Sequence, residues 1–263
     1  MEYVHPVTIF FFKKSFKVLL DHSLDHSKEY EKSMKKPIVI CGIDTDVGKS
    51  VVTGLLARHL MDQGKVVITQ KLVQTGCTDR PDDILVHRQF MSTGWLTPDE
   101  QGLTCPYCFP LPASPHLAAE RVGAKIDPTH LDTATDTLAE QVDQLIIEGA
   151  GGLLVPLTRE LLLLDYLQQR AYPLIVVTTP RLGSINHTLL CLEAIKNRKM
   201  DLLGLVYNIY GNDHTPEIVA DSLKIFQAAL GCYGFRKKVV LLPDIKESRS
   251  VHWDGLLSAA AHS

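Results

Sequence analysis

The chain has 263 residues, of which 45% are hydrophobic and 22% charged, and its formal net charge is −3. This size and composition predict one sizeable soluble α/β domain, or at most one and a half domains, with enough apolar residues for a core. The mild acidity argues against a nucleic-acid partner, which needs a basic excess, and no apolar run approaches the roughly 20 residues of a membrane span.

Residues 1–36 differ from the rest of the chain. An apolar run at 7–12 comes before the lysines at 13, 14 and 17, and no small-residue cleavage site follows it. A secretory signal has its basic residues first, so this segment does not fit one. We expect a disordered or loosely helical extension, with Met34 as a candidate start of translation. The alternative is an amphipathic membrane anchor.

The next segment has the pattern of a phosphate-binding loop. A short apolar strand ends at Gly42, and Gly48-Lys49-Ser50 follows after five residues, one more than the common spacing. An amphipathic helix pattern then begins. Glycines let the backbone approach anionic oxygens closely, and loop N–H groups bind these oxygens at the start of the helix. Lys49 would contact the β- and γ-phosphates and the Ser50 hydroxyl would bind Mg²⁺. The alternative is a plain turn with a solvated lysine.

Further along the chain, apolar runs alternate with helical patterns. The runs cover residues 65–70, 144–147, 173–178, 202–207 and 238–242. Continuous apolar runs of this length are typical of strands buried on both faces of a parallel sheet. The sequence therefore predicts an α/β, P-loop-type three-layer fold, in which helices flank a central, mostly parallel sheet.

Candidate ligand-binding residues follow these predicted strands, where open parallel sheets bind ligands. They are Lys71, Thr75, Glu148, Gly151 and Asn208. Asp82 and Asp83 are expected to open a helix. Mg²⁺ on a nucleotide prefers a hydroxyl, one or two carboxylates and water. Ser50, Glu148 and one of Asp82 and Asp83 would supply this set, although a single carboxylate at a strand end can instead cap a helix.

From about Pro37 to about Asp244 the chain resembles the dethiobiotin synthetases, ATP-dependent carboxylases that close the ureido ring on the path to biotin. Five segments carry the resemblance: residues 42–50, 71–76, 114–116, 148–152 and 182–187. The five-residue spacing of the phosphate loop is the one this family uses. The resemblance implies a single P-loop ATP-binding synthetase domain over residues 37–263, with ATP, CO₂ (or bicarbonate) and 7,8-diaminononanoate as substrates and Mg²⁺ as cofactor.

The resemblance also implies the reaction course. One nitrogen of the diamine is carboxylated to a carbamate, and a carbamate oxygen attacks the γ-phosphoryl group to give a mixed anhydride. The second nitrogen closes the ring and releases phosphate. Lys49 and Lys71 are the expected catalytic residues, because they would place two ammonium groups beside the negative carbamate and γ-phosphate.

The other site residues are carried over from the family by position. The expected metal ligands are Ser50, Asp83 and Glu148, with Asp82 as the competitor of Asp83. The expected nucleotide-binding residues are Asp46, Val47, Gly48, Lys49, Ser50, Val51, Glu148, Gly151, Asn208 (at the adenine), Pro243 and Asp244. The expected substrate-binding residues are Thr45, Lys71, Thr75, Leu182, Gly183 and Asn186. Asp46, Thr75 and Ser50 stand where the family more often has glutamate, serine and threonine.

In this family the active site lies at a dimer interface. Carried over, this implies a homodimer in which Gly183 and Asn186 contact diaminononanoate bound to the neighbouring subunit. From the residues alone, a helix N-terminus without a ligand is the simpler interpretation of this segment.

The main rival is a nucleotide-switched partitioning or scaffold ATPase of the same broad fold. Those proteins use a tighter loop with an additional lysine near its start, and residues 43–47 contain no lysine. A cobyric-acid-type amidotransferase would need a glutaminase domain, for which the chain has no room. Six scattered cysteines without a secretory signal indicate a reduced cytoplasmic protein.

Overall fold

In the computed structural model, the described residues are 36–210, 215–243 and 251–257, and they belong to one compact unit that begins at Lys36. Their main feature is a six-stranded sheet in the order β2-β5-β1-β6-β7-β8, in which all neighbours are parallel. The strands are β1 (Ile38–Gly42), β2 (Val67–Lys71), β5 (Gln144–Gly152), β6 (Leu174–Thr178), β7 (Leu202–Asn208) and β8 (Val239–Leu242).

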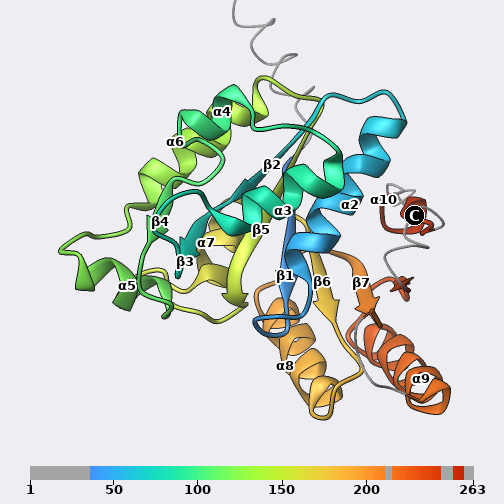
Figure 1. The fold of residues 1–263 in the computed structure, drawn as a ribbon. Helices are drawn as coiled ribbons and strands as arrows, with labels where there is room; N and C mark the ends of the chain where they lie inside the picture. Colours follow the sequence, from blue (N-terminus) through green and yellow to red (C-terminus); the bar gives the residue numbers. More distant parts are fainter. Residues whose placement is uncertain (1–35, 211–214, 244–250, 258–263) are drawn as a thin grey trace, which may run out of the picture. The chain divides into compact units, whose positions relative to one another are not determined.

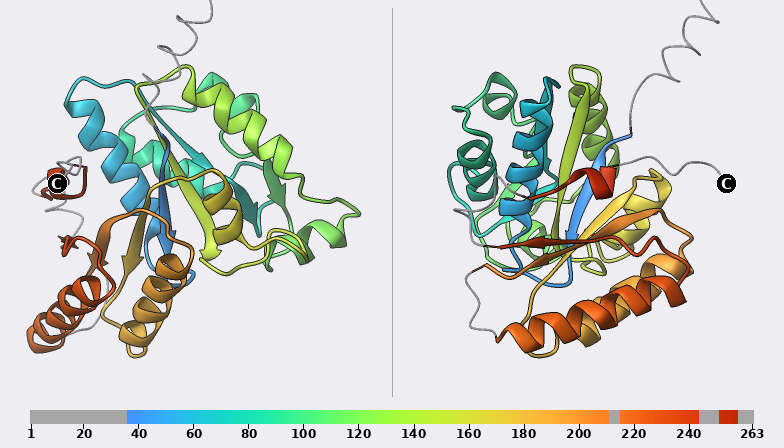
Figure 2. Two further views of the ribbon diagram at one scale, coloured as in Figure 1. Left: turned by 180° about the vertical axis from the view of Figure 1, so that it is seen from behind. Right: turned by 90° about the vertical axis from the view of Figure 1, so that its right-hand side faces the viewer.

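Helices cover both faces of this sheet (Figures 1 and 2). On one face lie α2 (Lys49–Asp62) and α3 (Asp82–Met91), and on the other lie α6 (Pro128–Ala139), α7 (Leu163–Gln169), α8 (Ser184–Asn197) and α9 (Pro216–Cys232). Right-handed crossovers place α2 on one face and α7, α8 and α9 on the other, because the chain moves one way along the sheet after β1 and the other way after β5. The connection from β2 to β5 contains both α3, which packs beside α2, and α6. Short helices complete the described part: α4 (Thr97–Glu100), α5 (Pro115–Arg121) and α10 (Asp254–Leu257). The predicted α/β three-layer class is confirmed.

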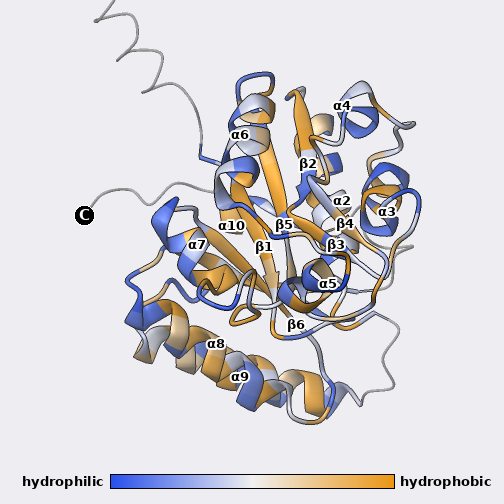
Figure 3. Cartoon of the chain, turned by 90° about the vertical axis from the view of Figure 1, so that its left-hand side faces the viewer, coloured by the Kyte–Doolittle hydropathy of each residue, from blue (hydrophilic) through white to orange (hydrophobic). Residues whose placement is uncertain are grey.

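The strands are where the apolar runs predicted them, because these runs form the core. Every residue of β1, β2 and β6 is buried, and Figure 3 shows the central strands as hydrophobic. Two boundaries differ from the prediction by two residues or more. Val66 is 58% exposed and lies before β2, and β5 continues past Ile147 to Gly152. Because β2 and β1 continue to pair with β5 there, Glu148 and Gly151 lie inside β5, and the prediction that they follow a strand was wrong. Lys71 and Asn208 were also predicted to follow their strands, but they are the last residues of β2 and β7.

A second, two-stranded parallel sheet was not predicted. It pairs β3 (Val73–Thr75) with β4 (Tyr107–Phe109). Three-residue strands are too short to show a periodic pattern in the sequence. The sheet matters for the site, because β3 follows directly after β2 and sets the position of Thr75.

The expectation for residues 1–36 lies, apart from Lys36, outside the described residues. Within the described ranges, no helix is long and apolar enough to cross a membrane.

A buried ion pair fixes α3 against the edge of the main sheet. Arg88 is 3% exposed, and its Nε and Nη2 lie 2.9 and 2.6 Å from the two carboxylate oxygens of Asp99. Arg88 also donates to Thr69 Oγ1 on β2, at 2.8 Å. Since α3 carries residues of the site described below, this pair helps to hold the site in place.

We expect Asp99→Ala to reduce the free energy of unfolding by about 3–5 kcal/mol, because it leaves the buried Arg88 guanidinium unpaired. Burial by itself raises the pKa of Asp99, but hydrogen bonds from Arg88 and Thr104 lower it below the ordinary value. The stabilisation is therefore present above pH of about 3.9 and lost as the pH falls through the lower folded-state pKa. Urea unfolding of both proteins between pH 7 and 3 measures this. A loss below about 1 kcal/mol at pH 7 would contradict the assignment.

Candidate active site

The loop between β1 and α2 has the geometry of an anion-binding loop. Gly48 precedes α2 with φ of +91°, and a Cβ there would lie 2.3 Å from the Asn208 side-chain nitrogen, so only glycine fits. Asp46 also has a positive φ, of 56°, a conformation that aspartate tolerates better than most residues. The free N–H groups and the dipole of the first turn of α2 therefore face the loop.

Lys49 is the first residue of α2 and is only 6% exposed. Its ammonium group donates to the backbone carbonyl of Asp44 at 2.7 Å, so the side chain folds back over the loop. Burial lowers the pKa of Lys49, and the nearby charge of Lys71 lowers it further. A phosphate at this position would therefore meet a cation that is largely removed from water.

Ser50, Asp83 and Glu148 converge beside the loop from α2, α3 and β5. The Ser50 hydroxyl oxygen lies 2.8 Å from Asp83 Oδ1 and 3.2 Å from Glu148 Oε1. One hydroxyl and two carboxylates form the hard oxygen set that Mg²⁺ prefers, so these residues fit that ion. Asp82, the competitor of Asp83, is exposed, and no contact joins it to Ser50 or Glu148 within the described residues.

Lys71, the last residue of β2, pairs with both carboxylates of this cluster. Its ammonium nitrogen lies 2.7 Å from Asp83 Oδ2 and 2.7 Å from Glu148 Oε1, and it donates to the Gly149 carbonyl at 3.1 Å. Burial by itself lowers the pKa of Lys71, but the two carboxylates raise it above its ordinary value. Lys71 is therefore a permanent cation at neutral pH.

His87 on α3 is a member of the cluster that the sequence analysis missed. It is fully buried, and its Nε2 lies 2.7 Å from Glu148 Oε2. Burial by itself raises the pKa of Glu148, but Lys71 and His87 outweigh burial and lower it to about 2. Glu148 is thus a buried carboxylate that stays ionised. The signal in the sequence was the spacing of His87, four residues after Asp83, which places both on one face of a helix.

A cavity of about 490 Å³ brings most of the predicted residues together. Its walls come from the phosphate loop, the ends of β2 and β5, β3 and the first turns of α2 and α3. The predicted residues that line it are Thr45, Asp46, Gly48, Lys49, Ser50, Val51, Lys71, Thr75, Asp83, Glu148 and Gly151. One cavity thus joins the expected triphosphate, metal and amine positions.

The remaining predicted residues lie elsewhere. Asn208 ends β7 and is buried, and its side chain donates to the Val47 carbonyl at 3.0 Å and accepts from the Tyr210 amide at 3.1 Å. Both ends of this amide support the backbone here, so its contact with adenine stays a prediction. Pro243 follows β8, and Asp244 lies outside the described residues.

Leu182, Gly183 and Asn186 precede or open α8, and they are all exposed. None of them lines the cavity of the phosphate loop. If they contact substrate, they do so on a surface of the chain that faces outward.

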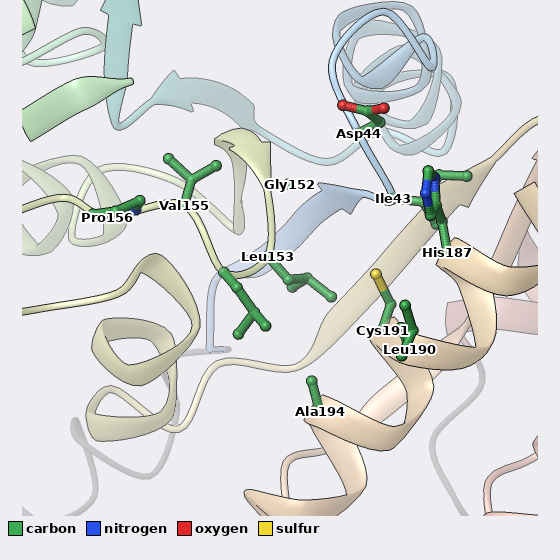
Figure 4. A pocket seen from close by; sticks show the side chains of 11 residues that line it. Ile43, Asp44, Gly152, Leu153, Val155, Pro156, His187, Leu190, Cys191 and Ala194 are labelled. Atoms are coloured by element: carbon green, nitrogen blue, oxygen red, sulfur yellow. The ribbon is translucent and has the colours of Figure 1, made fainter. Parts of the chain in front are cut away.

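A second, apolar pocket of about 470 Å³ lies between the residues after β5 and α8. Figure 4 shows Leu153 and Val155 on one side of it and His187, Leu190 and Cys191 of α8 on the other. Large apolar side chains are exposed around its rim and at the start of α8, namely Leu154, Leu182, Ile185 and Leu190. Leu182 is fully exposed.

Comparisons with known proteins identify relatives of this chain. Residues 36–233 match a protein family described as "AAA domain". The chain is 52% identical over 177 residues to the Haemophilus influenzae protein named ATP-dependent dethiobiotin synthetase BioD 2, covering 67% of this chain and 93% of that protein. It is 47% identical over 212 residues to ATP-dependent dethiobiotin synthetase BioD of Chlorobaculum tepidum, covering 80% and 88%. A solved ParA family ATPase from Chlorobium tepidum is more distant, at 16% identity and a TM-score of 0.47 over 86% of this chain and 90% of that one. This last similarity is too low to bear on function.

Proposed function

Because the chain belongs to the dethiobiotin synthetase family, we propose that it carboxylates 7,8-diaminononanoate with CO₂ and closes the ureido ring of dethiobiotin at the expense of ATP, giving ADP and phosphate. One observation carries the proposal. The phosphate loop, Lys71 and the Ser50, Asp83 and Glu148 oxygens line a single cavity. A triphosphate and an amine can meet there beside cationic groups.

Ser50, Asp83 and Glu148 would hold Mg²⁺, which supplies positive charge to the β- and γ-phosphate oxygens when it is bound. The residues of the chain position the reacting groups and neutralise the negative charge of the phosphates. The N–H groups of the loop and of the first turn of α2 bind the phosphates. Lys49, buried beside the loop, neutralises charge on the γ-phosphoryl group as the carbamate oxygen attacks it.

Lys71 belongs to the same cluster and is held there by Asp83 and Glu148. Its charge favours the carbamate over the free amine, because the carbamate is an anion. The Thr45, Asp46 and Thr75 side chains line the same cavity and would orient the diamine. Asp46 is one methylene shorter than the glutamate usual in the family, and Thr75 keeps the hydroxyl of the usual serine.

Phosphate release in four reaction mixtures tests the proposed function. All four mixtures contain ATP and Mg²⁺. The first has no further addition, the second has diaminononanoate, the third has bicarbonate and the fourth has both compounds. We expect phosphate only with both, together with a product of the mass of dethiobiotin. A partitioning or scaffold ATPase would release phosphate without either compound, and that result would overturn the proposal.

We further propose a homodimer whose substrate site is completed by the partner subunit. The exposed Leu154, Leu182, Ile185 and Leu190 around the apolar pocket support it, because such an apolar patch is unusual on a monomer surface. In a two-fold symmetric dimer, this patch on one subunit can pack against the same patch on the other subunit. Gly183 and Asn186, at the start of α8, would then reach the neighbouring cavity.

Leu182→Asp combined with Leu190→Asp is expected to convert the dimer into a monomer, because two charges would be buried in an apolar interface. Sedimentation velocity measures this, and Leu117→Asp, at an exposed leucine of α5, is the matched control. A wild-type chain that sediments as a monomer would contradict the dimer. Mixed Lys49→Ala and Asn186→Ala chains should regain activity if Asn186 acts in trans.

We also propose a cytoplasmic location. The cysteines of the described residues are all free thiols, as expected in a reducing compartment.

A further inference from the structure

Building on the proposed function, we propose that His87 is a positioning residue that fixes the orientation of the Glu148 carboxylate for metal binding. His87 does not line the cavity, and it reaches the site only through Glu148. It therefore acts on the reaction without touching the substrates.

The geometry divides the two oxygens of Glu148 between two tasks. His87 Nε2 lies 2.7 Å from Glu148 Oε2. Glu148 Oε1 lies 3.2 Å from the Ser50 hydroxyl oxygen and 2.7 Å from the Lys71 ammonium nitrogen. The terminal torsion of a glutamate side chain has broad, weakly defined minima. A partner on one oxygen is therefore needed to present the other in a constant direction. Hydrogen bonds to metal-binding carboxylates and imidazoles commonly have this role.

The His87 imidazole makes no other hydrogen bond within the described part of the chain. Nε2 must carry the proton that the carboxylate accepts, and Nδ1 is buried without a partner. An unsatisfied buried polar atom is unfavourable. A leucine would fill this interior position without that cost. The contact with Glu148 is thus what the imidazole adds at this position.

The helix that carries His87 also carries a second member of the site. Asp83 and His87 are separated by one helical turn on α3 and lie on the same face of it. The Arg88–Asp99 pair, next to His87 in sequence, fixes this turn. One rigid helix therefore supplies an expected metal ligand, Asp83, and the residue that orients another, Glu148.

Metal binding, measured apart from turnover, tests this role. Mn²⁺ binding to the full chain with a non-hydrolysable ATP analogue is followed by electron paramagnetic resonance. We expect His87→Leu to weaken Mn²⁺ binding by about 10- to 100-fold, with unchanged analogue affinity when metal is withheld. His87→Gln keeps an N–H donor of similar reach and should recover most of the affinity.

Ile84→Val is the matched control, because Ile84 is a fully buried residue of the same helix outside the cluster. Unfolding in urea reports the stability of each variant. If His87→Leu does not fold, His87→Asn replaces it, since its amide is too short to reach Glu148. Wild-type Mn²⁺ affinity in the folded His87→Leu or His87→Asn variant would overturn the inference. A loss of Mn²⁺ affinity in His87→Gln as large as the loss in His87→Leu would also overturn it. Absence of Mn²⁺-dependent analogue binding in the wild type would instead overturn the proposed function.

Discussion

Lys49→Ala is expected to lower kcat by about 10³-fold or more, the range seen when a group that neutralises transition-state charge is removed. The reason is the position of the ammonium group, which is buried beside the phosphate loop and folded over it. Charge that develops on the γ-phosphoryl group would lose the buried cation of the phosphate loop. Phosphate release at saturating diaminononanoate, bicarbonate and Mg²⁺-ATP measures the loss.

The control for Lys49→Ala is Lys224→Ala, which removes an exposed lysine of α9 and should leave kcat unchanged. Circular dichroism of the Lys49 variant should match the wild type, because among the described residues the Lys49 ammonium has no carboxylate partner that would be left unpaired. Turnover near the wild-type level would contradict the assignment of Lys49 to the triphosphate.

Lys71→Met is expected to reduce both activity and stability. Activity should fall by about 10²- to 10³-fold, because the carbamate loses its cation. The free energy of unfolding should fall by about 3–5 kcal/mol, because the buried Glu148 loses its main counter-charge. Nucleotide affinity, measured by calorimetry, should change little by comparison. Loss of nucleotide binding alone would show that Lys71 serves ATP and not the carbamate.

A second variant separates the two effects of Lys71. In Lys71→Met combined with Glu148→Gln, the uncompensated carboxylate is removed as well. Part of the lost stability should return, since removing both partners of a buried pair costs less than removing one. Activity should not return, because an expected metal ligand has also been removed. Restored activity would contradict a direct role for either residue.

The fold could be predicted from the sequence because its central strands are buried on both faces. A strand buried on both faces has a continuous run of apolar residues in the sequence. Each of the six strands lies close to its expected position. Strand ends were harder to predict. Residues 148–152 contain a carboxylate and three glycines, and only pairing with β1 and β2 extends the strand through them.

The site was predicted in part, for equally physical reasons. The phosphate loop depends on local residues in a fixed spacing, so the sequence alone indicated it. The contact between His87 and Glu148 joins residues 61 positions apart. The four-residue spacing of Asp83 and His87 predicts a shared helix face, but it does not predict Glu148 as the partner. The choice between Asp82 and Asp83 depends on which side of α3 faces Ser50, and the exact start of that helix decides it.

A crystal structure of the chain with Mg²⁺, a non-hydrolysable ATP analogue and diaminononanoate tests the central claim most directly. We predict Mg²⁺ at about 2.0–2.1 Å from oxygens of Ser50, Asp83 and Glu148, with the ammonium groups of Lys49 and Lys71 on either side of the γ-phosphate and the amine. A nucleotide bound away from Lys71, or a metal ion without Glu148 among its ligands, would contradict the account.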